Sequence, residues 1–178
     1  MGHWLSNTRA VEAVENGLGV LALIAAAVVL SAGRASAQQG DPFSGTWRMN
    51  RSASSFSPGP APERRTMTIA ITPDGLKMVT ETIRVFSEAQ NGGGVQRVEF
   101  VAMFDGKPHP ITGSALDTVS LRRIRPSEIE RKGYVRSEPD PVETCTVTVS
   151  KNGKVLTMRV NGTIDGMDYS SLQVFERQ

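Results

Sequence analysis

Two residue types that perform nucleophilic and acid–base chemistry occur only once beyond the first forty residues. His109 is the only histidine after His3, and Cys145 is the only cysteine of the chain. A cysteine and a histidine act together as nucleophile and base only where the thiolate is stabilised. Thr144 and Thr146 flank Cys145 and supply no stabilising charge. We therefore assign no catalytic residue, and an enzyme is the third of the three function classes that the sequence leaves open.

His109 stands in the segment DGKPHP, residues 105–110, between two expected strands. Proline on each side of it restricts the backbone and makes this turn rigid. A zinc site would need further nitrogen or sulfur ligands, so no metal site is predicted. Two interpretations stay open for His109: an exposed turn residue, or a residue at the mouth of the fold that forms a hydrogen bond to a ligand.

Charged side chains beside apolar strand positions form a second candidate site. Arg122 follows Val119 and Leu121, which we expect to face the interior. An inward Arg122 would need a ligand or an ion-pair partner, because an unpaired charge in an apolar interior is unfavourable. Glu143 shares a strand face with Cys145 and is a candidate partner. The alternative is that the strand twists or ends before Arg122 and leaves it in water.

Composition excludes several function classes. The chain has 178 residues, with 20 Lys and Arg against 18 Asp and Glu, and the net charge of +2 is too small to indicate nucleic-acid binding. One cysteine excludes an intramolecular disulfide framework and a cysteine-rich zinc site. No cofactor is indicated. Residues 122–136 do carry an excess of basic residues, which would suit a surface for protein or polymer partners.

The N-terminal segment has the pattern of an export signal. Residues 17–32 read GLGVLALIAAAVVLSA, Arg9 precedes them, and Ala35 and Ala37 place small residues where a signal peptidase cuts. We predict a signal peptide over residues 1–37, cleaved after Ala37, and a periplasmic or secreted protein. A retained membrane anchor is the alternative, but a helix over this run would span only ~24 Å of a ~30 Å core. No stable anchor is therefore expected after cleavage.

Residues 38–178 show the alternation of an all-β domain. Apolar and other residues alternate over 66–71 and 97–104, and turn sequences such as Asp105-Gly106 and Asp165-Gly166 separate such runs. Short turns between sequential strands predict an antiparallel up-and-down barrel of about 8–10 strands. Residues 50–65 are proline-rich and are expected to form a surface loop, either a flap over the barrel mouth or a passive connection.

One hairpin can be predicted in register. Asn152-Gly153 favours a type I′ turn, which would place Val149 opposite Leu156 and Cys145 opposite Val160. These apolar side chains would then share the inner face of the two strands.

The two ends of this domain resemble the lipocalin and fatty-acid-binding (calycin) superfamily. The first expected strand contains Gly45 and Trp47, and the last contains Arg177. The resemblance implies a barrel whose Trp47 plugs the closed end with Arg177 packed over the indole. Fatty-acid-binding proteins also hold a carboxylate with an Arg and a Tyr on the last strand. Gln173 and Phe175 stand at those positions, which argues against a carboxylate site of that kind.

The chain also resembles uncharacterised secreted bacterial proteins with the same Gly-Thr-Trp opening and a central Asp-Gly-Lys, a similarity that spans most of residues 41–178 but implies no activity. Our first hypothesis is an exported module that binds a small hydrophobic ligand. The second is a filled barrel that acts through its surface as a structural or protein-interaction domain. The sequence does not determine the oligomeric state. The expected ligand-binding residues are Phe100, Arg122, Cys145, Met158 and His109.

Overall fold

The computed structural model describes residues 40–73, 75–84 and 94–178. The predicted signal peptide and its cleavage site lie outside these residues. Within them, no helix is long and apolar enough to cross a membrane. The described residues form eleven β-strands: β1 (Gly45–Met49), β2 (Ser55–Ser57), β3 (Arg64–Thr72), β4 (Gly75–Arg84), β5 (Gly94–Met103), β6 (His109–Thr112), β7 (Thr118–Arg125), β8 (Glu128–Tyr134), β9 (Glu143–Val149), β10 (Val155–Ile164) and β11 (Met167–Arg177).

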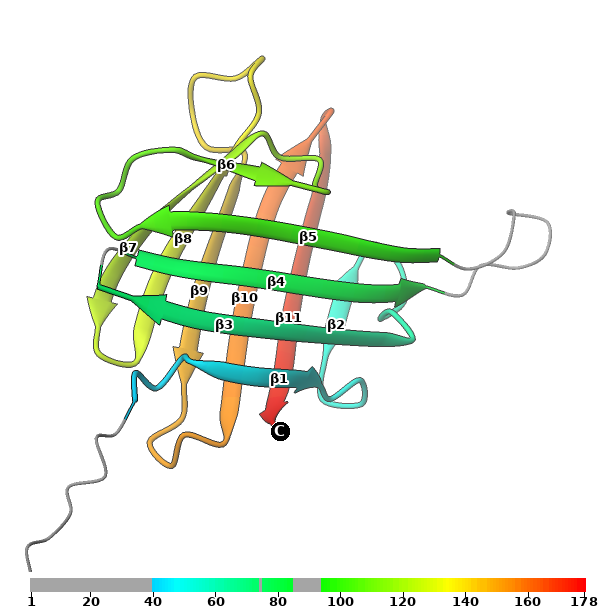
Figure 1. Ribbon diagram of the computed structural model, residues 1–178. Coiled ribbons are helices and arrows are strands. Elements are labelled where there is room, and N and C mark those ends of the chain that lie inside the picture. Colours follow the sequence, from blue (N-terminus) through cyan, green and yellow to red (C-terminus); the bar gives the residue numbers. More distant parts are fainter. Residues whose placement is uncertain (1–39, 74, 85–93) are drawn as a thin grey trace, which may run out of the picture. The chain divides into compact units, whose positions relative to one another are not determined.

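Ten of these strands close into an antiparallel barrel. Strand β1 pairs with β3, each strand from β3 to β10 pairs with the next one along the chain, and β11 returns to pair with β1. The prediction of an all-β, antiparallel up-and-down barrel of about 8–10 strands is confirmed. In Figure 1, strands β3, β4 and β5 cross the strands β8 to β11 behind them at a steep angle. The space between these two walls is the interior of the barrel.

The inner face of the barrel carries the apolar residues of the alternating runs, and the opposite face of each strand meets solvent. Strand β9 shows this most regularly, because Cys145, Val147 and Val149 are buried while the threonines between them are more exposed. The core joins the walls into one cluster in which Trp47, Phe43 and Phe175 are fully buried.

The hairpin of β9 and β10 has the predicted register but not the predicted turn. Val149 pairs with Leu156 and Cys145 pairs with Val160. Only Gly153 has a positive φ in this loop, so the type I′ assignment for Asn152-Gly153 is wrong. The turn between β10 and β11 does have two positive φ values, 53° at Asp165 and 73° at Gly166, which is the type I′ pattern.

The proline-rich segment is only partly a loop. Residues 55–57 form β2, which pairs with β11 through pairs such as Phe56 with Ser171, and Phe56 lines the barrel cavity. Residues 64 and 65, assigned to the loop from the sequence, begin β3. The prolines at 58, 60 and 62 lie between these two strands, where no ladder donor is needed.

The N-terminal and C-terminal strands meet at one end of the barrel. The Arg177 guanidinium lies 4.1 Å from the centre of the Trp47 ring. It also donates hydrogen bonds to the carbonyl oxygens of Pro42, Ser44 and Gly153. Gly45 has φ +135°, and a Cβ at this position would lie 2.5 Å from the Arg177 guanidinium. The arginine thus closes this end of the barrel, and the glycine leaves room for it.

Candidate functional site

The barrel contains a cavity of about 480 Å³ that extends inward from the end opposite Trp47. Its inner part is apolar, and its outer part carries arginine, glutamate and hydroxyl side chains. The lining residues are Phe56, Ser57, Pro58, Arg65, Met67, Met78, Thr80, Thr82, Arg84, Gln96, Val98, Ile111, Ser114, Ala115, Leu116, Arg131, Glu143, Met158, Val160, Ile164, Tyr169, Ser170, Ser171, Gln173 and Phe175.

Arg65 is the central polar residue of one wall. It occupies the same face of β3 as the buried Met67, and its Nε donates to Thr82 Oγ1 at 3.0 Å. Its terminal nitrogen donates to Gln173 Oε1 at 2.6 Å, across to the last strand. Burial, together with the positive charges of Arg84 and Arg131, lowers the pKa of the Arg65 guanidinium to about 10. The group therefore still carries its positive charge at neutral pH.

A second polar group lies on β8, β9 and β11. Arg131 donates to Glu143 Oε1, and the Tyr169 hydroxyl donates to Glu143 Oε2 at 2.8 Å. The Arg131 and Glu143 side chains are only 11% and 9% exposed, so this is a buried ion pair. Burial lowers the pKa of Arg131, but the negative charges that Cys145 and Glu143 can carry outweigh burial and raise it. Burial and then the Glu143 carboxylate raise the pKa of the Tyr169 hydroxyl.

Arg131 is not fully satisfied by this pair. Its Nε is the one buried side-chain nitrogen or oxygen of the described residues that has no hydrogen-bond partner. Buried polar atoms are normally paired, so this unpaired and covered nitrogen is an unfavourable feature of the barrel interior. The cavity thus combines an apolar interior with arginine side chains nearer its mouth.

The structure brings only one of the five expected ligand-binding residues to the cavity surface. Met158 lines the cavity, whereas Phe100 and Cys145 are buried in the wall without lining it. Burial, with the negative charge of Glu143 added, raises the pKa of the Cys145 thiol to about 11 although Arg131 opposes this. At neutral pH the thiol is therefore protonated and a weak nucleophile.

Arg122 is exposed, so the structure selects the solvated alternative for this residue. The inner face of β7 carries Val119, Leu121 and then Arg123, because side chains two apart share a face. Arg123 forms an ion pair with Asp41 at 2.6 Å. Its guanidinium also lies over the rings of Phe43 and Phe104. The suggested pairing of Arg122 with Glu143 is wrong, because Arg131 occupies that position.

His109 is half-buried at the start of β6, and its Nε2 lies 3.1 Å from Asp105 Oδ1. A hydrogen bond from the Lys107 backbone, followed by the contact with His109, lowers the pKa of Asp105. Cys145 lies three strands away in the sheet order. Among the described residues, no group of histidine, cysteine and carboxylate side chains could hold a metal ion.

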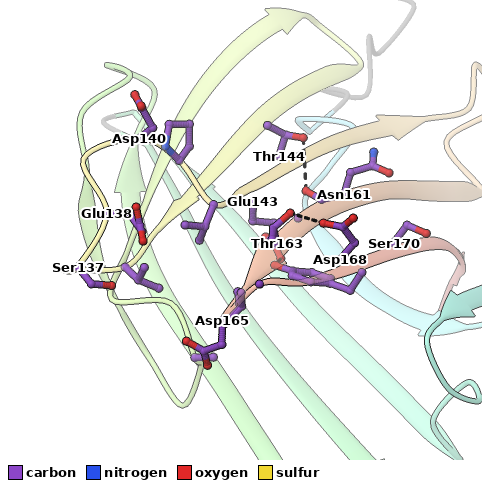
Figure 2. A pocket seen from close by; sticks show the side chains of 18 of the residues that line it. Ser137, Glu138, Asp140, Glu143, Thr144, Asn161, Thr163, Asp165, Asp168 and Ser170 are labelled. Carbon is purple, nitrogen blue, oxygen red and sulfur yellow. Dashed lines mark hydrogen bonds between the residues drawn. The ribbon is translucent and has the colours of Figure 1, made fainter.

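A larger hollow of about 960 Å³ lies outside the cavity mouth. Figure 2 shows Glu138 and Asp140 on the connection between β8 and β9, and Asp165 on the turn between β10 and β11. Glu143 and Tyr169 line both this hollow and the cavity. The hollow is therefore the approach to the barrel interior rather than a separate site.

Arg65 and Arg84 were not predicted as site residues, and Arg131 was predicted only as part of the basic segment 122–136. Each shares strand parity with buried residues: Arg65 with Met67, and Arg131 with Ile129. Extending the alternation by one step toward the strand ends would have placed these arginines inside the barrel. Because Arg65 was assigned to the proline-rich loop, the alternation of β3 was not extended to it.

No protein-family model and no curated protein sequence matches the chain. Among solved structures, the zebrafish ileal bile acid-binding protein, complexed with cholic acid, is similar over 77% of this chain and 99% of its own, with 10% identity and a TM-score of 0.45. The siderocalin Ex-FABP is similar over 77% of this chain and 71% of its own, with 7% identity and a TM-score of 0.40. What each of these proteins binds is a property of that protein. The barrel of this chain is established by its strand pairing.

Proposed function

We propose that the protein is an exported module that holds a small, mostly apolar molecule inside its barrel. The observation that carries this proposal is the cavity of about 480 Å³, which reaches the fully buried Phe175. Ligand sites typically occupy about 300–1,000 Å³ and combine an apolar lining with a few polar groups. A filled barrel that acts only through its surface has less support, because its side chains would occupy this volume.

The apolar lining favours a flexible or variable ligand shape. Met67, Met78 and Met158 line the inner part of the cavity. Methionine side chains adapt to irregular apolar surfaces because they are unbranched and polarizable. The proposed ligand is therefore held mainly by burial of its apolar surface, with its position set by the polar groups near the mouth.

Binding of N-phenyl-1-naphthylamine, whose fluorescence rises in an apolar environment, tests this proposal. Val98 lines the cavity, whereas Val101 lies on the same strand with its side chain 58% exposed. We expect V98W to weaken binding because the larger indole occupies part of the cavity, and V101W to bind like the unaltered protein. Equal binding by both variants, or no binding by the unaltered protein, would reject the lumen as the site. If the unaltered protein binds the probe, native mass spectrometry of the gently purified protein would give the mass of any molecule retained in the barrel.

Export is part of the same proposal. It is supported by the apolar run at 17–32 and by the small residues Ala35 and Ala37, and it agrees with the resemblance to secreted bacterial proteins. The mass of the protein recovered from the envelope or medium of an expressing bacterium tests it. A chain that begins at Gln38 is the expected result, and an uncleaved chain in the membrane would contradict it.

A further inference from the structure

We propose that the molecule held in the barrel carries one anionic group, which Arg65 and Arg131 bind near the cavity mouth. This inference rests on the proposed function, because it specifies the ligand of the same cavity. It depends on three observations: the charges that line the cavity, the hydrogen bonds of Arg65, and the position of Arg131 in the cavity lining.

The charges that line the cavity do not balance. Arg65, Arg84 and Arg131 line it, and Glu143 is the one carboxylate among its lining residues. This leaves two positive charges in excess, since three arginines face one glutamate. The repulsion among the three arginines acts on Arg65, because the pKa of its guanidinium is lowered by burial and then by the positive charges of Arg84 and Arg131. A ligand anion would offset this repulsion in a region of low dielectric constant, where the attraction is strong.

Arg65 is held in position but has no counter-ion among the described residues. Its two hydrogen bonds go to neutral acceptors, Thr82 Oγ1 and Gln173 Oε1. The Gln173 side chain is fixed in turn, because its nitrogen donates to Ser171 Oγ at 2.8 Å. These contacts use the Nε and one terminal nitrogen of the guanidinium. A guanidinium has five N–H donors, so Arg65 retains donors for a ligand without losing its anchors.

Arg131 supplies the second part of the site. Glu143 accepts from one terminal nitrogen of Arg131, and the buried Nε of Arg131 has no partner among the described residues. Arg131 also lines the cavity, and its positive charge acts on Arg65, so a ligand anion near Arg65 would be attracted by both guanidinium groups.

The carboxylates of the outer hollow do not neutralise these arginines. Glu138, Asp140, Asp165 and Asp168 all lie at exposed positions, where water and salt screen their charge. The arginines lie further in, within the cavity lining. We therefore expect selection for an apolar body with a single negative head group.

Two fluorescent probes of nearly the same shape test this inference on the full protein. 8-Anilino-1-naphthalenesulfonate is N-phenyl-1-naphthylamine with a sulfonate added. We expect the anionic probe to bind more tightly than the neutral one. We expect R65M to weaken binding of the anionic probe by about ten- to a hundredfold, the effect of losing a charged hydrogen-bonding partner, and to leave neutral-probe binding unchanged.

The matched control is R64M, because Arg64 is the exposed neighbour of Arg65 on the outer face of β3. It removes the same charge and should change neither probe's affinity. Should R65M fail to fold, competition on the unaltered protein still decides. Decanoate, decyl sulfate or decyl phosphate must displace the neutral probe at lower concentration than 1-decanol does, and their order identifies the preferred head group.

Each outcome has a distinct meaning. Equal affinity for the two probes, with decanol competing as well as the anions, would overturn the anion site and leave the proposed lumen function intact. The same holds if R65M and R64M weaken anionic-probe binding equally. Failure of the unaltered protein to bind either probe would overturn both proposals.

Discussion

Replacing Glu143 with glutamine removes the charge that compensates Arg131 inside the barrel. The substitution keeps the shape of the side chain and leaves one oxygen for the Tyr169 hydroxyl, which donates to Glu143 Oε2 at 2.8 Å. What it removes is the negative half of an ion pair whose side chains are 11% and 9% exposed. The guanidinium is then left in the interior without a counter-ion, and the Nε that already lacks a partner gains none.

The magnitude follows from this burial. Removing one partner of a buried ion pair destabilises a protein by about 3–5 kcal/mol, because the remaining charge is desolvated without compensation. A domain of this size has a total stability of about 5–15 kcal/mol, so the loss is a large part of it. With a urea m value of about 2 kcal/mol/M, the unfolding midpoint of E143Q should fall by roughly 2 M.

Urea unfolding monitored by circular dichroism measures this midpoint. The matched control is E99Q, because Glu99 pairs with Lys77 at 2.8 Å and Arg97 at 3.2 Å on the outer surface. Exposed pairs of this kind contribute below about 1 kcal/mol, since water and salt screen them. Adding R131M to E143Q should recover much of the loss, because no unpaired charge then remains in the interior.

Two results would refute this reasoning. If E143Q lowers the midpoint no more than E99Q does, the interior pair is screened as a surface pair is. If the effects of E143Q and R131M simply add, the loss does not come from an unpaired charge.

Two further predictions concern the closed end and the thiol. G45A should lower the free energy of unfolding by about 1–3 kcal/mol, because Gly45 has φ +135° and an added Cβ would displace Arg177. G40A is the control, since a Cβ at Gly40 meets nothing within 4 Å, and it should change the free energy of unfolding by less than about 0.5 kcal/mol. Equal urea midpoints for the two variants would contradict this prediction. Cys145 should resist thiol reagents in the folded protein. Its pKa is raised from 9.0 to about 11, which contributes up to about 3 kcal/mol of stability that is complete below pH 9 and is lost as the pH rises to 11. C145A should lack this part of the pH dependence of stability, and the same slope in both proteins would show that the thiol does not cause it.

The periodicity of the sequence was sufficient to predict the barrel wall. Alternation over 66–71 and 97–104, together with short turn sequences, predicted antiparallel neighbours and the residues that face inward. The register of Val149 with Leu156 followed because a hairpin couples residues that are close in the chain. Such features depend on local backbone geometry and on which face is apolar, and both can be obtained from a short stretch of sequence.

The polar interior was decided by tertiary structure. The contact between Arg65 and Gln173 joins residues 108 positions apart, and Arg177 reaches a carbonyl 133 positions away. Alternation indicates that an arginine faces inward, but barrel closure determines which side chains it meets. The misassigned partner of Glu143 has a more local cause. Arg131 lies on β8, next to the strand of Glu143, and faces inward, whereas Arg122 lies one strand further away and is exposed. The sequence by itself therefore determined the wall of the barrel, while the folding of the sheet into a closed barrel decided which polar side chains from distant strands meet inside it.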